Sequence, residues 1–250
     1  MSNQKSGKKK KIAAIVPSAG IGKRFGSDKN KAFHLLMGKP VIVWSLELLE
    51  SIGNVAEIVP VFNKNDLQEG SRLIKKHGIS KIKKIAIGGK ERQNSVYNAL
   101  NLIDKDTDIV LIHDAVRPLV EKAQVEKALK QLEGIDGIII GVQPKDTIKE
   151  LLYKTHKGKN ELFVKKTLDR RALLAVQTPQ IFKYNVLLKA YKKAMREGFY
   201  STDDAALVEK FGGKIKIMLG SYSNIKITTP EDIETARILI KKKRGRRKAQ

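Results

Sequence analysis

Short apolar runs alternate with stretches of helical periodicity along most of the chain. The apolar runs that predict β-strands are 11–16, 55–62, 82–87, 108–113, 136–142 and 214–219. Between them, apolar residues recur with the period of amphipathic helices over 41–52, 65–77, 91–103, 121–133, 183–197, 203–211 and 230–242. This alternation predicts an α/β fold, Rossmann-like, in which a mainly parallel sheet carries helices on both faces.

Two prolines give local information about these elements. Pro60 lies inside the run 55–62, and because proline has no N–H for a β-ladder, we expect this strand to end or bulge there. Pro230 follows Thr229, and Glu231 and Asp232 come next. A cap residue, a proline and two acids in this order predict the start of the last helix.

One segment interrupts the alternation. Residues 146–168 consist of two strand-like stretches around the turn signal "HKGKN". A hairpin of this kind has too little apolar surface to be stable alone. We therefore expect a protruding β-arm that packs against a second copy of the chain, with a simple surface hairpin as the alternative.

Length and composition limit the class of protein. The 250 residues are 41% hydrophobic, which is enough for one substantial core or two small ones. No run of about 18 apolar residues is present, so we expect no membrane partner. The absence of cysteine excludes disulfides, thiolate metal ligands and a cysteine nucleophile, and it agrees with a cytoplasmic location.

The net charge of +24 is concentrated at the two ends. Residues 1–11 contain five lysines and residues 241–250 contain seven basic residues, with no acid in either segment. Because blocks of like charge resist folding, we expect basic disordered tails at 1–10 and 241–250 around a single domain at 11–240. Weak nonspecific contacts of the tails with RNA or acidic surfaces are the alternative. With 6% aromatic residues and no stacking motif, the domain itself does not have the pattern of a nucleic-acid-binding protein.

The first strand leads directly into the glycine-containing loop "PSAGIGKRF", residues 17–25. Gly20 and Gly22 would allow backbone N–H groups to approach phosphate oxygens closely. Lys23, Arg24 and Lys31 add positive charge within nine residues. The loop matches neither the dinucleotide-binding pattern nor the Walker pattern. It predicts a phosphate-binding site at the carboxyl end of the first strand.

Three other polar segments follow predicted strands or precede the last helix. They are "GGKERQNSV" at 88–96, "HDAVRP" at 113–118 and "NIKITTPED" at 224–232. The carboxyl ends of parallel strands lie at the same edge of a sheet, and ligands bind there in α/β folds. We therefore expect these segments to surround the same site as the glycine loop.

In this order, the segments resemble the 2-C-methyl-D-erythritol 4-phosphate cytidylyltransferases. The resemblance covers about residues 11–240 and also includes "PKDTIK", "TLDRRALLAVQTPQIF" and "STDDAALVE". It implies that CTP and 2-C-methyl-D-erythritol 4-phosphate react to give 4-diphosphocytidyl-2-C-methyl-D-erythritol and pyrophosphate, with Mg²⁺ or another divalent cation. In this reaction, the substrate phosphate attacks the α-phosphorus of CTP in line. A ribitol-5-phosphate cytidylyltransferase is the alternative enzyme, and a basic nucleic-acid-binding protein is a distant one.

The resemblance also implies the roles of individual residues. It implies catalytic roles for Arg24 and Lys31 at the α-phosphate. The residues implied in CTP binding are Pro17, Ser18, Ala19, Gly20, Gly22, Lys23, Gly89, Arg92, Ser95, Asp114 and Ala115. Those implied in positioning the substrate phosphate are Arg170, Thr178, Thr202 and Lys226, with Arg117 and Thr147 elsewhere in the pocket.

Three further expectations concern the nucleotide, the metal and the dimer. Lys90 stands where the family often has aspartate beside the cytosine pocket, which leaves the strictness for CTP open. We expect the divalent cation to be carried mainly by the triphosphate, with Asp114 as the candidate protein ligand. The resemblance implies a homodimer through the β-arm, in which Arg170 projects into the pocket of the neighbouring subunit.

Overall fold

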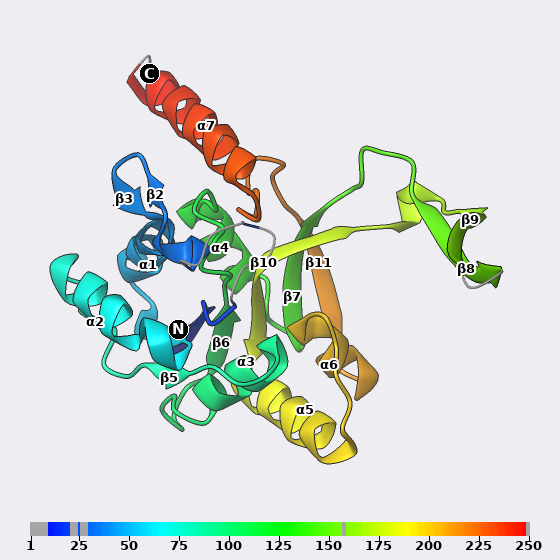
Figure 1. Ribbon diagram of the computed structural model, residues 1–250. Coiled ribbons are helices and arrows are strands. Elements are labelled where there is room, and N and C mark those ends of the chain that lie inside the picture. The colour runs from blue at the N-terminus through cyan, green and yellow to red at the C-terminus, as the bar shows by residue number, and fades with distance from the viewer. Residues whose placement is uncertain (1–9, 21–24, 26–29, 157–158, 249–250) are drawn as a thin grey trace, which may run out of the picture.

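A seven-stranded sheet runs through the centre of the computed structural model, which describes residues 10–20, 25, 30–156 and 159–248 (Figure 1). Its strands, from one edge to the other, are β11 (Ile215–Leu219), β7 (Gly137–Val142), β10 (Ala175–Lys183), β6 (Ile109–Ile112), β1 (Ile12–Pro17), β4 (Val55–Phe62) and β5 (Ala86–Ile87). Strand β10 is antiparallel to both of its neighbours, and the other neighbouring strands are parallel. The expectation of a mainly parallel sheet is confirmed.

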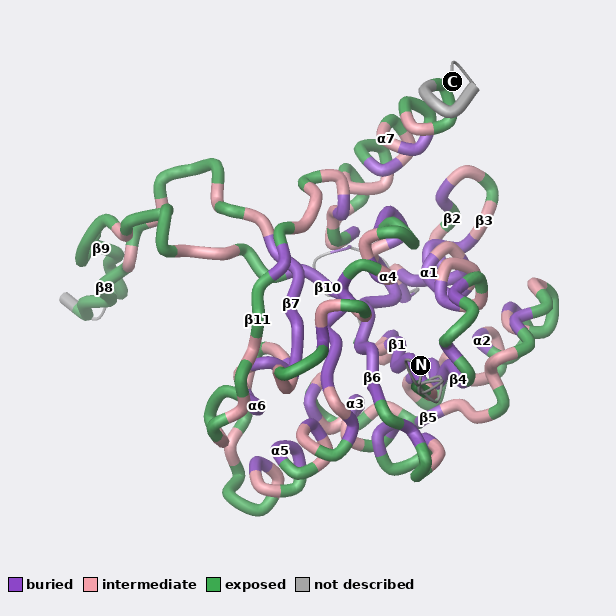
Figure 2. Tube along the Cα trace, turned by 180° about the vertical axis from the view of Figure 1, so that it is seen from behind, coloured by how far each residue is buried: buried purple, intermediate pink, exposed green. Residues whose placement is uncertain are grey.

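Helices cover both faces of this sheet. One face carries α1 (Val41–Ser51), α2 (Leu67–Lys76), α4 (Lys122–Lys130) and α7 (Pro230–Lys248). The other carries α3 (Arg92–Leu100), α5 (Tyr184–Glu197) and α6 (Asp204–Lys210). Along β1, Ile12, Ala14 and Val16 pack into the first core, whereas Ala13 and Ile15 pack into the second. Because successive side chains of a strand point to opposite faces, a strand buried on both faces is a continuous apolar run. Figure 2 shows the central strands as the buried part of the fold.

Shorter elements join these layers. They are the two-residue strands β2 (Leu35–Leu36) and β3 (Lys39–Pro40) and the 3₁₀ turns η2 (Lys31–Phe33), η3 (Lys64–Asp66) and η4 (Arg170–Ala172). Among the described residues, no helix is long and apolar enough to cross a membrane.

The apolar runs predicted the strands well, with one shortened strand and one wrong detail. The run 82–87 contributes only β5, Ala86–Ile87. Strand β4 continues through Pro60 without a bulge at that residue. On the outer side of β4, Ile58 donates its N–H to Lys81, and pairing with β5 begins only at Val61. The N–H that proline lacks is therefore not needed on that side.

Strand β10 was not predicted from the sequence. It contains Thr178 and Pro179, and its pairing with β7 shifts register between Gln177 and Gln180. A proline in a polar stretch argues against a central strand. The register shift explains how this proline is accommodated, because a bulge interrupts the ladder at the position where no N–H is available.

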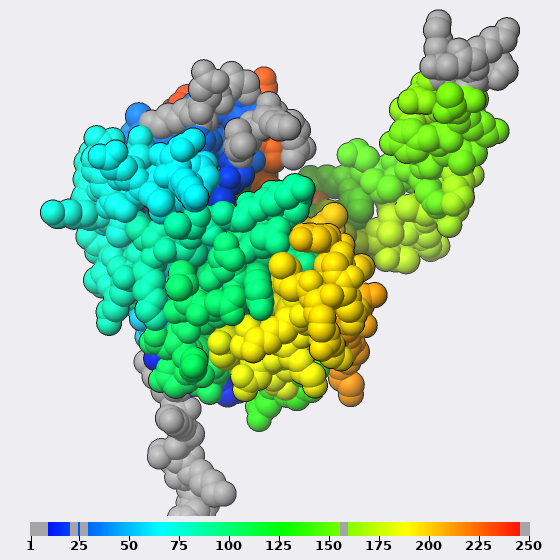
Figure 3. All heavy atoms as spheres, turned by 60° about the horizontal axis from the view of Figure 1, so that its bottom comes forward, coloured from blue at the N-terminus to red at the C-terminus, as the bar shows by residue number. Residues whose placement is uncertain are grey.

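The segment 146–168 forms the expected hairpin, of β8 (Lys149–His156) and β9 (Lys159–Thr167), which projects from the body (Figure 3). The register places Leu151 opposite Val164 and Tyr153 opposite Leu162. Directly opposed residues lie on the same face of a hairpin, so these four side chains form one apolar face. Each of them is between 46% and 73% exposed in the single chain.

The last helix is longer than expected. Helix α7 begins at Pro230, as the capping signals predicted, but it continues to Lys248. The expectation of a disordered tail at 241–250 is therefore wrong for 241–248. Lysine and arginine are good helix formers, and this helix is attached to the body at several points. Ile240 is buried, and Lys243 forms an ion pair of 2.8 Å with Glu121. At the other end of the chain, the expected tail at 1–10 lies almost wholly outside the described residues.

Candidate active site

A cleft of about 210 Å³ lies beyond the carboxyl ends of β1 and β6. It is lined by Pro17, Ser18, Ala19, Gly20, Asn30, Lys31, Ala32, Gly89, Lys90, Glu91, Arg92, Ser95, Asp114, Ala115, Val116 and Lys226. The three polar segments and the glycine loop thus meet at one place, as the strand order of an α/β sheet requires. Lys90 belongs to this lining. That it affects the selectivity for the cytosine base stays a prediction.

One wall of the cleft is formed by two loops in close contact. A Cβ atom added to Gly88 would lie 2.3 Å from the Cβ of Ala19, so a larger residue at this position would push the loops apart. The Ser95 hydroxyl accepts the N–H of Gly89 at 3.0 Å and donates to the carbonyl of Glu91 at 3.1 Å. Ser95 therefore stabilises the turn that leads into helix α3.

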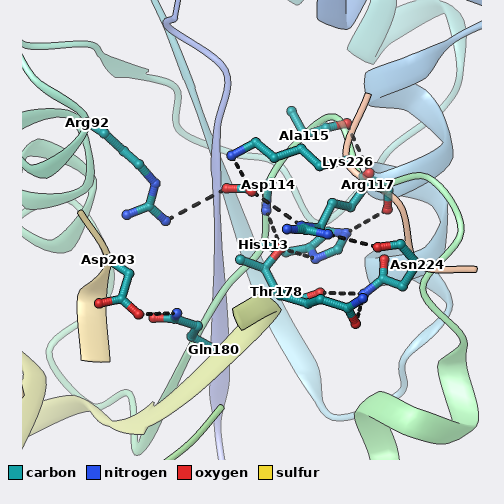
Figure 4. Close-up of polar contacts among 12 residues, drawn as sticks. Arg92, His113, Asp114, Ala115, Arg117, Thr178, Gln180, Asp203, Asn224 and Lys226 are labelled. Atoms are coloured by element: carbon teal, nitrogen blue, oxygen red, sulfur yellow. Dashed lines mark hydrogen bonds and ion pairs between the residues drawn. The ribbon is translucent and has the colours of Figure 1, made fainter. Parts of the chain in front are cut away.

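The opposite wall is built around the carboxylate of Asp114, which three cations approach from different elements (Figure 4). Lys226 Nζ lies 2.9 Å from Oδ2, Arg117 Nε lies 3.5 Å from Oδ2, and Arg92 Nη2 lies 3.8 Å from Oδ1. Asp114 is almost completely buried. Burial would raise the pKa of Asp114, but Lys226, Arg92 and Arg117 outweigh it and hold this pKa well below its usual range. The carboxylate is therefore ionised. It pairs directly with Lys226, and it attracts the guanidinium groups of Arg117 and Arg92, which lie slightly farther away.

Thr178 holds the backbone of Asp114 and is itself hydrogen-bonded to His113. The Thr178 hydroxyl oxygen accepts the N–H of Asp114 at 3.0 Å and lies 3.1 Å from His113 Nδ1. His113 Nε2 faces the carbonyl of Arg117 at 3.1 Å, so Nε2 carries the proton and Nδ1 accepts one from Thr178. Burial lowers the pKa of His113 to about 4, so the ring is neutral at physiological pH. The Thr178 hydroxyl thus makes two hydrogen bonds within the protein, one as acceptor and one as donor.

Asn224 links the segment before α7 to the same network. Its side-chain amide donates to the main-chain carbonyl of Thr178 at 3.0 Å, and the main-chain carbonyl of Asn224 accepts from Arg117 Nη1 at 2.8 Å. Asn224 is completely buried, so these hydrogen bonds are shielded from water. They set the position of Lys226 two residues later.

The cleft does not contain every residue that the sequence predicted. Thr202 lines a neighbouring cavity of about 470 Å³ that shares Lys90, Glu91 and Arg92 with the cleft. Thr147 and Arg170 are exposed and flank the projecting hairpin, where Arg170 donates to the carbonyl of Lys145. Gly22, Lys23 and Arg24 lie outside the described residues.

Two polar residues of the site were not assigned a role from the sequence. Asn30 donates to the Ser18 carbonyl at 2.6 Å and to Asp66 at 2.7 Å, and no local pattern distinguishes it from a surface asparagine. Asp204 forms a 2.7 Å ion pair with Arg92. Its signal was the acidic pair in "STDDAALVE", which also resembles an ordinary helix start.

The described residues do not fit a divalent cation held by the protein alone. Within the described part of the chain, no three histidine, aspartate or glutamate side chains come together as a metal site. The Asp114 carboxylate is already surrounded by Lys226, Arg117 and Arg92, whose positive charges would repel a metal ion. We therefore assign no ligand role to Asp114.

Comparison with known proteins agrees with this geometry. The family model described as 2-C-methyl-D-erythritol 4-phosphate cytidylyltransferase matches residues 12–242. A protein of that name from Caldanaerobacter subterraneus subsp. tengcongensis is 39% identical over 232 residues, which are 92% of this chain and 99% of that protein. Another from Clostridium acetobutylicum is 41% identical over 230 residues, 92% of this chain and 97% of that protein.

A solved structure is similar over the same range. The crystal structure of 4-diphosphocytidyl-2C-methyl-D-erythritol synthase from Anaerococcus prevotii superimposes with a TM-score of 0.79 at 29% identity. It covers 94% of this chain and 100% of that one. The match of the family model, the identity of the relatives and the position of the cleft lead to the same conclusion. The chain belongs to the 2-C-methyl-D-erythritol 4-phosphate cytidylyltransferase family.

Proposed function

We propose that this chain is a nucleotidyltransferase that joins CTP and 2-C-methyl-D-erythritol 4-phosphate, releasing pyrophosphate. The product is 4-diphosphocytidyl-2-C-methyl-D-erythritol, an intermediate of non-mevalonate isoprenoid biosynthesis. The observation that carries this proposal is the cleft itself. A glycine-containing loop at the carboxyl end of β1 faces an ionised carboxylate that pairs with Lys226 and lies close to Arg117 and Arg92.

The chemistry needs no covalent enzyme intermediate. An oxygen of the methylerythritol phosphate forms a bond to the α-phosphorus of CTP while the bond from that phosphorus to the β-phosphate bridging oxygen breaks. The electron pair leaves with pyrophosphate. Both reactants are anions, so the protein must hold them together against their repulsion and neutralise the charge that develops. The cations beside the described cleft suit this task.

Lys31 and Arg24 are the residues we propose for stabilising charge at the α-phosphate. Lys31 lines the cleft at the start of η2. Lys226 lies on the other side, paired with Asp114, and we propose that it holds the phosphate of the methylerythritol substrate. We propose that CTP arrives as its complex with Mg²⁺ or another divalent cation, so that the cation belongs to the substrate.

For Thr178, the geometry favours an indirect role over the direct one that the resemblance implies. A hydroxyl must donate its proton to bind a phosphate oxygen, and the Thr178 proton is directed at His113 Nδ1. We propose that Thr178 acts by holding the backbone of Asp114.

We propose that the enzyme is a homodimer and that the apolar face of the hairpin is its contact surface. Leu151, Tyr153, Leu162 and Val164 expose this face in one chain, and a second hairpin would cover it around a two-fold axis. Replacing Leu162 by aspartate should give a monomer in analytical ultracentrifugation. Replacing Lys165, which pairs with Glu150 on the hairpin, by glutamine is the control that should leave the dimer intact.

In such a dimer, Arg170 would serve the cleft of the partner subunit. Its planar guanidinium could hold a phosphate through two parallel hydrogen bonds. Mixing an inactive Arg170→Ala chain with an inactive Lys31→Ala chain tests this role. Each heterodimer would contain one intact site, so about a quarter of wild-type activity should return after subunit exchange. Confirmed exchange without recovered activity would show that Arg170 serves its own chain.

The proposal includes a single nucleotidyltransferase domain at 11–240 and a cytoplasmic location. Both apolar cores share one sheet, which supports one domain. The experiment that tests the function is incubation of the protein with CTP, Mg²⁺ and each candidate polyol phosphate, followed by measurement of pyrophosphate release. We expect release with methylerythritol phosphate and little with ribitol 5-phosphate. The reverse preference would favour the ribitol-5-phosphate enzyme.

A further inference from the structure

Three helices meet at a fully buried carboxylate next to Arg92, a residue that lines the cleft. Asp204 is the first residue of α6, and it is 0% exposed. Arg92 Nη1 donates to Asp204 Oδ1 at 3.0 Å, and Arg92 Nη2 donates to Oδ2 at 2.7 Å. The hydroxyl of Tyr191, on α5, also donates to Oδ1. Arg92 is the first residue of α3, so the carboxylate ties together the starts of two helices and the middle of a third.

The arrangement fixes Arg92 without using all of its donors. A guanidinium carries five N–H donors in a planar fork, and the bidentate contact with Asp204 occupies two of them. Tyr191 is itself fully buried, and its ring is stacked parallel to that of Tyr97 with centroids 6.1 Å apart. Burial and the charge of Asp204 raise the pKa of Tyr191 well above its usual value, so this hydroxyl keeps its proton as a donor.

We propose that Asp204 and Tyr191 are positioning residues that act through Arg92 and thereby set the affinity of the cleft for CTP. The inference rests on the proposed function for the identity of the ligand. Without Asp204, Arg92 would lose its bidentate partner and would be free to move toward Asp114, which lies 3.8 Å away. It would then compete with Lys226 for that carboxylate.

The test compares Asp204→Asn, Tyr191→Phe, Arg92→Met and the double variant Arg92→Met/Asp204→Asn. CTP affinity is measured by titration calorimetry, and kcat and KM are measured by pyrophosphate release. We expect Asp204→Asn to raise the Kd and KM for CTP about ten- to a hundredfold, the size of a lost charged hydrogen bond, with a smaller change in kcat. Tyr191→Phe should raise them a few-fold. Asp203→Asn is the matched control, because Asp203 contacts Gln180 and the start of α6 but not Arg92.

The double variant separates positioning from a purely structural role. If Asp204 acts through Arg92, the double variant binds CTP no more weakly than Arg92→Met alone. Additive losses, or a Tyr191→Phe protein with unchanged affinity, would overturn the proposal. Thermal unfolding gives a readout that is independent of CTP. Arg92→Met leaves a buried carboxylate without its cation and should melt at a lower temperature than the double variant. A wild-type protein that binds no CTP would refute the proposed function instead.

A separate observation concerns the end of α7. The segment 241–248, "KKKRGRRK", contains no acidic and no apolar residue, and it is helical. The family model ends at 242, so most of this segment lies outside the part shared with the relatives. Lys243 is paired with Glu121, and the Arg244 guanidinium lies 6.0 Å from the centre of the Trp44 ring. The helix is thus attached to the body while Lys241, Lys242 and Arg244 are exposed.

We infer that this basic end of α7 is a docking surface for the phosphate backbone of nucleic acid. Lys241, Lys242 and Arg244 are exposed cations on a helix that is attached to the body, so they could contact phosphates of a nucleic-acid backbone together, and binding would release condensed counterions. Insertion into a membrane surface needs an apolar helix face, which 241–248 lacks. Binding of this kind is independent of base sequence and sensitive to salt.

Two deletions provide a test with matched charge. Removing residues 244–250 and removing residues 1–10 each take away four lysine or arginine side chains. Fluorescence anisotropy with a labelled 20-base-pair duplex at about 0.1 M salt measures the affinity. We expect the C-terminal deletion to weaken binding about tenfold and to lower the salt dependence, and the N-terminal deletion to have a smaller effect. Equal losses from the two deletions would mean that net charge alone attracts DNA, and they would overturn the inference. Stronger binding of the intact chain to anionic phospholipid vesicles than to DNA would also overturn it.

Discussion

Replacing Thr178 by valine tests the hydrogen-bond network under Asp114. Valine has nearly the shape of threonine, so the change removes the hydroxyl and little else. Two buried groups then lose their partner, the N–H of Asp114 and Nδ1 of His113. Each unsatisfied buried group costs about 1–3 kcal/mol, so the free energy of unfolding should fall by about 2–6 kcal/mol. For a domain with a typical stability of about 5–15 kcal/mol, this is a large loss.

Thr178→Ser is the matched control, because it keeps the hydroxyl and removes a methyl group worth about 1 kcal/mol. Urea unfolding followed by circular dichroism gives the stabilities, and pyrophosphate release gives kcat and KM. We expect the valine variant to lose both stability and activity and the serine variant to keep most of each. A valine variant that is inactive but as stable as wild type would refute the network and return Thr178 to direct contact with the substrate.

Three further predictions concern the charges of the site and the tails. Lys31→Ala should lower kcat by about a hundredfold, because a fixed charge at the transition state is lost, and Lys31→Arg should retain more activity in the same pyrophosphate assay. A near-normal kcat for Lys31→Ala would contradict the catalytic role. The second prediction concerns pH, because the folded pKa of His113, about 4, lies below its ordinary value of 6.5. The unfolded chain therefore binds a proton first, and stability should fall as pH decreases from 6.5 to 4, by about 3 kcal/mol in total. Urea unfolding at several pH values should show this slope, which should be absent in His113→Asn. Asp114 has a lowered pKa, and its contribution should be lost only below about pH 4, where unfolded aspartate takes up its proton. Finally, deleting 1–10 together with 244–250 should leave kcat/KM within a few-fold of wild type at moderate salt, and a large loss would place one of the ends at the cleft.

Local patterns in the sequence were sufficient to predict most elements and part of the site. Periodicity predicted the strands and helices because each buried strand needs an apolar run and each surface helix needs one apolar face. The glycine loop and "HDAVRP" were recognisable because each combines its turn residues and charges within a few positions. The start of α7 at Pro230 followed from capping chemistry, which is equally local.

The sequence failed where distant segments decide the outcome. Strand β10 is a central strand despite Pro179, because β6 and β7 pair with it on both sides and a register shift accommodates the proline. The end of α7 is helical despite its repelling charges. One of these charges, Lys243, is paired with Glu121, which lies far away in the sequence and close in space.

The site itself was decided by tertiary structure. Lys226 and Asp114 are more than a hundred positions apart, as are Arg92 and Asp204, and no local pattern pairs them. Their contacts depend on the order of strands in the sheet, which brings the ends of separate strands and helices to one edge. The sequence by itself determined which residues could carry charge and which backbone could turn tightly. Only the fold determined which cation faces which carboxylate, because ionic and hydrogen-bonded contacts require a few ångströms of separation that sequence distance does not specify.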